Sequence, residues 1–295
     1  MTSIFVPYKA FLIKTNVAVT IQSDKQTLLD ELNDPFAVPA EVVAHYRAKG
    51  YVKLKQVLSP DVLDYYGTLI SDLVIQLNTL TKPMEERTTY ERAFLQIMNL
   101  WRENDEVREF VFSRRLAKVA ADLMEVDGVR LYHDQALYKE PSGGITPWHA
   151  DQFYWPLASP KTVTVWIPLQ ETPMHMGPLA FAEGSQHVEI GRDIEISDDS
   201  EKILSDELQR QNFPMNDSPF ELGEVSYHAG WTFHRAGPNT SDRPRKVMTM
   251  IYMDRDQVIM PPRNSYQTAD WATWLDNKAV GSAPDSYLNP VLFER

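Results

Sequence analysis

Two side chains that could share a metal ion stand two residues apart in the stretch 147–155, Pro-Trp-His-Ala-Asp-Gln-Phe-Tyr-Trp. If this stretch runs as a strand, His149 and Asp151 project from the same face, because alternate residues of a strand share a face. An imidazole and a carboxylate would then lie side by side as metal ligands. The third ligand has to come from elsewhere, and our candidate is His234, 83 residues after Asp151 (234 − 151).

Two histidines and one carboxylate leave three coordination positions open, which suits an iron(II) ion that activates dioxygen. An α-keto acid can chelate the metal through two of these positions, and O2 can take the third. Arg245, eleven residues after His234 (245 − 234), could bind the distal carboxylate of a keto diacid such as 2-oxoglutarate with both arms of its guanidinium. The alternative for Arg245 is a solvated basic turn, shared with Arg243 and Lys246.

Other residues have two possible roles each. His228, six residues before His234, is a rival ligand or a supporting or core histidine, and the remaining histidines are expected at the surface or in structural roles: His45, His133, His175 and His187. Three aromatic residues after the ligand pair wall a pocket or belong to the core: Phe153, Tyr154 and Trp155. Gln96 and Asn99 are expected on a helix. Their side chains either reach the pocket or have ordinary capping or packing roles.

Composition limits the partners of the chain. Its 295 residues carry 29 basic and 41 acidic side chains, a net charge of −12, which argues against a surface that follows nucleic-acid phosphates. There is no cysteine, so a metal has to be held by His, Asp or Glu. Residues 4–19 are partly apolar but make a poor signal peptide, and no apolar run is long enough for a membrane span. We expect a cytoplasmic monomer or homodimer that acts on a small molecule, without nucleic acid or membrane partners.

The chain changes character near Gly128. Ser59-Pro60-Asp61 is a helix start, followed by apolar residues every three or four positions, and further helices are predicted at 91–101, 105–112 and 115–124. Beyond Gly128, β-branched and aromatic runs predict strands at 129–139, 162–169, 179–182, 224–228 and 247–253. Helices followed by many short strands predict a mainly β domain, an antiparallel sandwich or barrel with flanking helices.

We expect one domain over residues 1–295, with a mainly helical part at 1–127 and a β core at 128–254. Residues 188–222, rich in acidic side chains, are an insertion, either a solvated surface excursion or a lid over a pocket. The tail at 255–295 carries large aromatic residues, among them Trp271, Trp274 and Tyr287, and is expected to pack on the core.

Several segments in this order resemble the phytanoyl-CoA dioxygenase family of iron(II)- and 2-oxoglutarate-dependent oxygenases, over about residues 46–253. The segments are Tyr138-Lys139-Glu140-Pro141, Trp148-His149-Ala150-Asp151, residues 164–169, Gly177-Pro178-Leu179, Gly184-Ser185-Gln186-His187, and His234 through Arg245. The resemblance implies a double-stranded β-helix, or jelly roll, with the metal site near one open end. It also implies that Thr164 and Trp166 face the 2-oxoglutarate, and that Gln135 occupies another such position.

The chain departs from the family pattern in two places. Ala236 stands where family members often have a serine, so one polar contact to the co-substrate is missing. Ala182-Glu183 replaces a proline before the Gly-Ser turn. Related halogenases have a small residue in place of the carboxylate ligand, whereas Asp151 fills that position, so hydroxylation or another oxidation without chloride is favoured.

Two other classes remain as alternatives. A cupin-like isomerase or hydrolase could hold zinc or another ion with the same three ligands, but it would have no use for Arg245. A silent small-molecule binding module could keep the fold, although buried His and Asp without a metal would be costly to desolvate.

Overall fold

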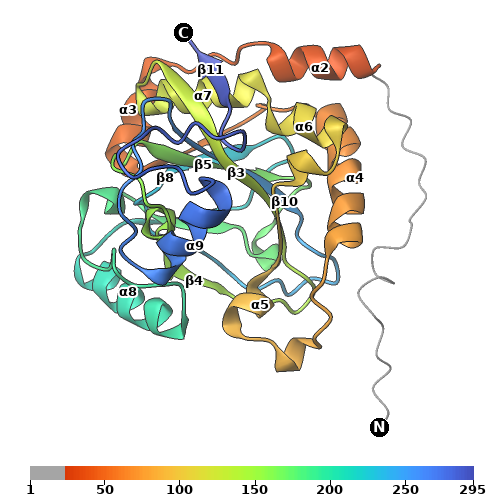
Figure 1. Cartoon of the computed structure of the whole chain (residues 1–295). Coiled ribbons are helices and arrows are strands. Elements are labelled where there is room, and N and C mark those ends of the chain that lie inside the picture. Colours follow the sequence, from red (N-terminus) through yellow and green to blue (C-terminus); the bar gives the residue numbers. More distant parts are fainter. Residues whose placement is uncertain (1–23) are drawn as a thin grey trace.

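The computed structural model describes residues 24–295, and within them two antiparallel sheets enclose the centre of the molecule (Figure 1). The larger sheet has the order β1-β8-β5-β10-β3-β11, with β2 also paired to β3: β1 (Tyr51–Leu54), β8 (Val225–Ala229), β5 (Thr162–Pro168), β10 (Val247–Asp254), β3 (Gly128–Tyr138), β11 (Val291–Glu294) and β2 (Leu95–Met98). The smaller sheet has the order β4-β9-β6-β7: β4 (Thr146–His149), β9 (His234–Ala236), β6 (Leu179–Ala182) and β7 (Met215–Asp217). This is the jelly roll that the resemblance implied.

Helices come mainly before the β core, as predicted. They are α2 (Lys25–Asn33), α3 (Ala40–Lys49), α4 (Pro60–Leu77), α5 (Thr89–Ala93), α6 (Asp105–Val111), α7 (Arg114–Met124), α8 (Asp198–Arg210) and α9 (Ser265–Trp274). The predicted start of α4 is confirmed, because the Ser59 side chain accepts a hydrogen bond from the Val62 amide and Pro60 opens the helix. No helix in this part of the chain is long and apolar enough to cross a membrane. The apolar stretch at 4–19 lies outside the described residues.

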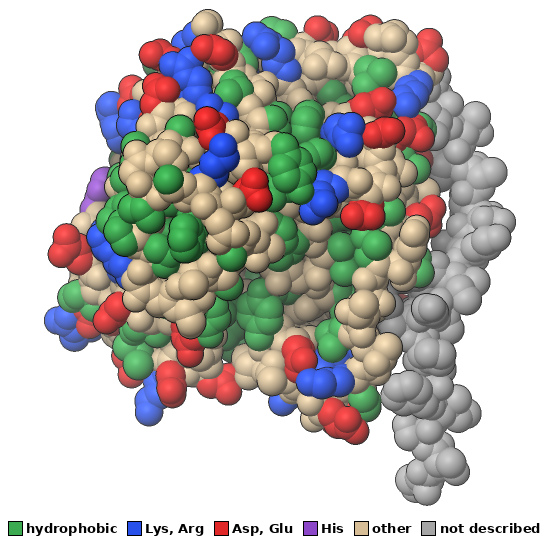
Figure 2. All heavy atoms as spheres, in the orientation of Figure 1, with side chains coloured by type: hydrophobic (Ala, Val, Ile, Leu, Met, Phe, Trp, Pro, Cys, Tyr) green, Lys and Arg blue, Asp and Glu red, His purple; other side chains and the backbone are tan. Residues whose placement is uncertain are grey.

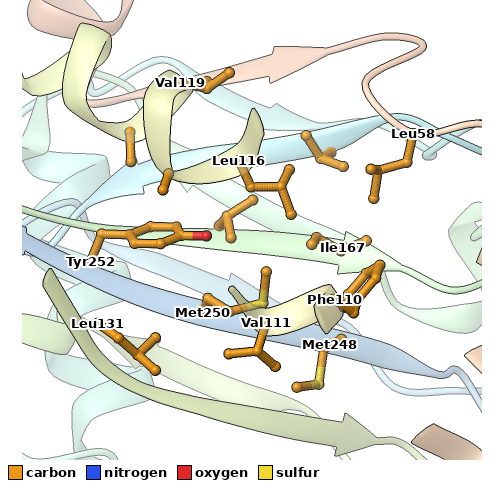
Figure 3. Close-up of a cluster of buried hydrophobic side chains, with 14 of the residues drawn as sticks. Leu58, Phe110, Val111, Leu116, Val119, Leu131, Ile167, Met248, Met250 and Tyr252 are labelled. Carbon is orange, nitrogen blue, oxygen red and sulfur yellow. The ribbon is translucent and has the colours of Figure 1, made fainter. Parts of the chain in front are cut away.

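The main core lies between the larger sheet and the helices that cover it (Figure 3). Along β10, Met248, Met250 and Tyr252 pack in this core with helix residues such as Leu116 and Phe110. The residues between them, including Thr249 and Ile251, face the opposite way and line a cavity between the two sheets. Because strand side chains alternate, each central strand contributes one face to stability and the other to the cavity.

Strand β3 carries a bulge at Tyr132. Ile251 of β10 pairs with His133 and Tyr252 pairs with Leu131, so Tyr132 has no partner of its own. The extra residue reverses which faces the odd-numbered and even-numbered side chains of β3 point to, before and after the bulge. Leu131 therefore packs in the helix-covered core, whereas His133 and Gln135 line the cavity.

One predicted helix is wrong. Residues 91–101 were expected to be helical, but α5 ends at Ala93 and Leu95–Met98 form β2. This strand pairs with the C-terminal part of β3, from Gln135 to Tyr138. Gln96 pairs there with Leu137, and its side chain lines the cavity from a strand. Asn99 follows with a left-handed backbone and does not line the cavity. Sheet pairing overrides the local helical preference here.

The 188–222 segment and the tail both pack on the β core. Helix α8 lies against β4 on the lower side of the molecule in Figure 1, with Leu204 and Leu208 buried beside Trp148 and Phe233. Strand β7 extends the smaller sheet by pairing with β6. In the tail, β11 pairs with β3, and Trp271 and Trp274 of α9 pack on a second apolar cluster. The 188–222 segment is therefore not a free solvated loop.

Candidate metal centre and co-substrate pocket

His149 and Asp151 project into the same cavity although only the histidine lies in a strand. β4 ends at His149, and Asp151 begins a 3₁₀ turn, Asp151–Tyr154. The expected strand is thus shorter than predicted. Ala150 between them keeps an extended backbone, with φ −124° and ψ 127°, which preserves the alternation that brings the two side chains together.

His234 opens β9 and pairs in register with His149. The two ring centroids are 4.2 Å apart. The Nδ1 of His149 lies 2.7 Å from the Pro147 carbonyl oxygen, and the Nδ1 of His234 lies 3.0 Å from the Thr232 carbonyl oxygen. A carbonyl can only accept, so each Nδ1 donates and each Nε2 is left with a lone pair, as a metal ligand requires.

Asp151 faces both imidazoles with one oxygen and is held by the other. Its Oδ1 lies 3.6 Å from the Nε2 of His149 and 3.6 Å from the Nε2 of His234. Its Oδ2 accepts a hydrogen bond of 2.8 Å from the Thr164 hydroxyl. One potential ligand atom from each of the three residues lies within 4.8 Å of the others. The structure thus assembles the three ligands predicted from two distant stretches of chain.

His228, the rival ligand, supports this group from the side. Its Nε2 lies 3.3 Å from Oδ2 of Asp151, the oxygen that Thr164 also contacts, and its ring centroid is 4.3 Å from that of His234. It is therefore placed behind the carboxylate rather than beside Oδ1. Its Nδ1 is buried without a hydrogen-bond partner among the described residues.

Burial sets the charge of the three side chains. Desolvation lowers the pKa of His149 and of His234 to about 4, so both rings are neutral at physiological pH. Burial alone would raise the pKa of Asp151, but the neighbouring His234, His228 and His149 outweigh it and hold that pKa well below its usual range. Two neutral imidazoles beside one carboxylate are the protonation state in which such residues bind a divalent cation.

Arg245 is buried at the wall of the same cavity, with a relative exposure of 1%. Its Nη1 donates to the Gly177 carbonyl oxygen, and its guanidinium carbon lies 5.3 Å from the centre of the Trp166 ring. Its Nε has no hydrogen-bond partner within residues 24–295. No carboxylate among residues 24–295 forms an ion pair with it. A solvated turn is therefore the wrong interpretation for Arg245, whereas Arg243 is exposed. A buried guanidinium with an unused donor fits an anionic ligand.

The other expected co-substrate contacts also line the cavity. Thr164 and Trp166 lie two residues apart on β5 and face inward, about 6.6 Å apart along the strand. Gln135 accepts a hydrogen bond of 2.6 Å from the Gln96 side chain, whose own oxygen accepts one of 2.7 Å from Tyr90. Ala236 also lines the cavity, where family members often have a serine, and its methyl group offers no polar contact.

The cavity measures about 480 Å³, within the usual range for small-molecule sites. Of the three aromatic residues after the ligand pair, Tyr154 and Trp155 line it and Phe153 does not. His133, expected at the surface or in a structural role, also lines it, whereas the other three such histidines are exposed: His45, His175 and His187.

Three lining residues on α9 were not predicted. Tyr266, Asp270 and Trp274 recur every four residues, the spacing of one helix face, and all three line the cavity. That spacing is the signal that was present in the sequence. It was missed because the tail carried no other indication of a helix against the site. Hydrophobic side chains gather on the face of the molecule that carries α9 (Figure 2).

Comparisons with known proteins agree with this geometry. The model of the phytanoyl-CoA dioxygenase family matches residues 46–247. A probable α-ketoglutarate-dependent hypophosphite dioxygenase of Stutzerimonas stutzeri is 25% identical over 235 residues, which cover 74% of this chain and 79% of that protein. α-Ketoglutarate is another name for 2-oxoglutarate.

Two solved structures show the same fold. The α-ketoglutarate-dependent carbocyclase SnoK from nogalamycin biosynthesis has a TM-score of 0.71 at 24% identity and covers 88% of this chain and 99% of its own. The epimerase SnoN, in complex with Fe3+, α-ketoglutarate and nogalamycin RO, has a TM-score of 0.70 at 22% identity and covers 86% of this chain and 98% of its own. At these identities the likeness establishes the fold.

Proposed function

We propose, from the premise that this chain belongs to the phytanoyl-CoA dioxygenase family and is an iron(II)- and 2-oxoglutarate-dependent dioxygenase, that it hydroxylates a small or medium-sized organic molecule. The products of the co-substrate would be succinate and carbon dioxide. The observation that carries the proposal is one cavity that holds both a group of three side chains able to bind a metal ion and a buried guanidinium that forms no ion pair with any residue from 24 to 295.

We assign the metal to His149, Asp151 and His234. Their Nε2 and Oδ1 atoms converge, both rings are neutral, and the carboxylate is ionised, so no proton has to be displaced from the ligand atoms before a cation binds. Iron(II), when bound with 2-oxoglutarate and O2, supplies the oxidising chemistry. Thr164 and His228 contact the other carboxylate oxygen and keep Oδ1 turned toward the two imidazoles.

We assign the distal carboxylate of 2-oxoglutarate to Arg245. The guanidinium lies over Trp166, and Trp166 stands about 6.6 Å along β5 from Thr164, which contacts Asp151. A five-carbon diacid is long enough to reach from the metal ligands to this guanidinium. Lys139 pairs with Arg245 through the backbone, but burial lowers the pKa of its amine to about 6, so Arg245 is the cation at this end of the cavity at physiological pH. Gln135, Thr164 and Trp166 would then border the co-substrate.

Two features support hydroxylation of an organic substrate. Asp151 fills the ligand position that a halide would need, so oxygen insertion is favoured over halogenation. The cavity beyond the ligands is walled by Tyr90, Tyr154, Trp155 and other aromatic residues, which suit a carbon skeleton better than a small inorganic anion such as hypophosphite.

The packed 188–222 segment reaches this cavity at one point. Ile196 lines it, and its backbone amide donates to the Tyr154 hydroxyl at 2.9 Å. We therefore propose that this segment closes one side of the substrate site, as part of a single oxygenase domain. The net charge of −12 disfavours nucleic-acid partners, and we further propose that the protein is a cytoplasmic monomer or homodimer.

An anaerobic titration tests the proposal. Iron(II) followed by 2-oxoglutarate should produce a weak visible charge-transfer band in the wild type, and His149→Ala and Asp151→Ala should lose both the band and succinate formation in air. His175→Ala, an exposed histidine outside the cavity, is the matched control and should behave as the wild type. Succinate production at the wild-type rate in Asp151→Ala would remove the ligand assignment, and a missing band in the wild type would favour a cupin-like metalloprotein.

A further inference from the structure

Helix α9 presents a carboxylate to the end of the cavity opposite Arg245. Trp166, over which the Arg245 guanidinium lies, pairs with Thr249 of β10. Ile251, two positions and about 6.6 Å further along the strand, belongs to the apolar cluster that contains Tyr132 and against which Trp274 packs. The metal ligands lie near the level of Ile251, because Thr164, which contacts Asp151, pairs with it.

The position of α9 is fixed to the turn that contains Asp151. The Asn264 side chain caps the helix by accepting from the Gln267 amide at 2.8 Å, and the Gln267 side chain donates to the Phe153 carbonyl oxygen at 2.9 Å. Gln267 is buried. Because Asp270 follows less than one turn later, its carboxylate is held at a defined place relative to the metal ligands.

Asp270 has no counter-charge within the part of the chain that the structure describes. One oxygen accepts a hydrogen bond of 2.9 Å from the Tyr132 hydroxyl, and no lysine, arginine or histidine among these residues forms an ion pair with it. Burial raises the pKa of this carboxyl to about 7. Leaving such a group unpaired destabilises the fold, so its position against the cavity suggests a partner that arrives from outside.

Aromatic rings surround this carboxylate. Tyr266 and Trp274 lie one turn before and after Asp270 on the same face of α9. Tyr266 packs edge-on against Tyr154 at 5.4 Å between centroids, and Trp274 lies 5.4 Å from His133. Burial lowers the pKa of His133 to about 4, so this ring adds no positive charge. Aromatic faces attract cations, and a carboxylate among them is a common receptor for an organic ammonium group.

We propose that the substrate carries a protonated amine on a hydrophobic body, and that Asp270, flanked by Tyr266 and Trp274, binds this amine. The inference rests on the proposed function, because it treats this end of the cavity as the substrate side. The amine anchors one end of the molecule, and the aromatic walls hold the carbon skeleton beside the metal ligands. Specificity then comes from an ion pair that a neutral analogue cannot form.

A paired set of probes tests the inference. Benzylamine, phenylbutylamine and cyclohexylamine are each compared with the corresponding alcohol, and phenylbutyrate serves as an anionic probe. Binding is measured by tryptophan fluorescence on the anaerobic enzyme loaded with iron(II) and 2-oxoglutarate. We expect at least one amine to bind about tenfold or more tightly than its alcohol, equivalent to about 1.4 kcal/mol. Alcohols or phenylbutyrate that bind as tightly as every amine would overturn the proposal.

Two variants locate the effect. Asp270→Asn should abolish the preference for amines, whereas Asp256→Asn, which removes an exposed carboxylate outside the cavity, should retain it. The preference should also weaken between pH 8 and pH 6, as Asp270 takes up a proton. The facing groups Tyr132, Tyr266, Tyr90 and His133 do not change charge in this range, because the pKa of each tyrosine is raised and that of His133 is lowered.

The readouts separate this inference from the proposed function. The charge-transfer band in the same samples reports iron and 2-oxoglutarate, and fluorescence reports the amine. A normal band with no amine preference overturns only the substrate class. A missing band with an intact, Asp270-dependent amine preference overturns the oxygenase assignment instead.

Discussion

Replacing Arg245 by methionine should strengthen the fold and weaken the enzyme at once. The guanidinium is buried, no carboxylate in the described part of the chain forms an ion pair with it, and desolvation lowers its pKa from 12.5 to about 9. That shift corresponds to at most about 5 kcal/mol at about 1.4 kcal/mol for each pKa unit. Because the group is charged in both the folded and unfolded chain at pH 7, the folded protein carries this penalty throughout the physiological range.

Methionine also removes two favourable contacts of Arg245. The cation over Trp166 contributes about 1–2 kcal/mol, and the hydrogen bond to Gly177 contributes about 1.5–3 kcal/mol. Subtracting them leaves a net gain of up to about 2.5 kcal/mol in the free energy of unfolding without ligand, in line with buried charges replaced by apolar residues. A gain of about 1 kcal/mol, near the middle of this range, should raise the melting temperature by about 2–4 °C.

The same change should weaken 2-oxoglutarate binding by at least about 30-fold, because truncating one partner of a buried charge pair costs about 2–5 kcal/mol. At a hundredfold excess over its dissociation constant for the wild type, 2-oxoglutarate with iron(II) should stabilise the wild type by about 2.7 kcal/mol and the variant by at most about 0.9 kcal/mol. Anaerobic thermal unfolding with and without ligand measures both effects. Arg243→Met, at an exposed arginine two residues away, is the control and should change neither. An Arg245→Met protein that is less stable without ligand, or that binds 2-oxoglutarate normally, would refute the reasoning.

Three further changes test other parts of the structure. Thr164→Val removes the hydroxyl that holds Asp151, so iron(II) affinity should fall about 10- to 100-fold in a metal titration, and an unchanged affinity would contradict this role. Asp134→Asn removes a carboxyl whose pKa is raised to about 7 by burial. Such an acid stabilises the fold at low pH and loses this contribution as the pH rises through 7, so wild-type stability should fall by about 1.4 kcal/mol more than that of the variant between pH 6 and pH 8 in urea unfolding. Equal pH dependence would show that Asp134 is not responsible. Gly177→Ala places a methyl group against the Gly237 carbonyl at a φ of +69°, so we expect a loss of at least about 2 kcal/mol and weaker 2-oxoglutarate binding, and a neutral result would contradict the close approach.

The three proposed metal ligands could be predicted from the sequence, whereas the side chains that hold them in place could not. His149 and Asp151 share a face at any extended geometry, and the spacing to His234 and Arg245 was enough to predict one site. The contact of Thr164 with Asp151 depends on how β5 sits against the turn after β4, which no local pattern encodes.

The wrong helix at 91–101 and the missed residue Asp270 also depend on contacts between segments that are distant in the sequence. Residues 91–101 carry good helix formers, and only pairing with β3 turns Leu95–Met98 into a strand. Asp270 was not singled out from the sequence, because a charge on a short amphipathic helix is usually solvated. Its proposed role depends on the fold, which places α9 beside the cavity.

The unpaired Tyr132 sets which face each half of β3 presents. Val129, Leu131, His133 and Gln135 are all odd-numbered, and in a strand of the same length without a bulge they would lie on one face. Removing Tyr132 would make Leu131 and His133 consecutive residues, which alternate onto opposite faces without a bulge, so both would keep their places. An insertion or a second deletion would send either the apolar pair into the pocket or the histidine and glutamine under the helices. Natural variation in this strand should therefore tolerate the loss of this one residue and otherwise take the form of side-chain exchange at constant length.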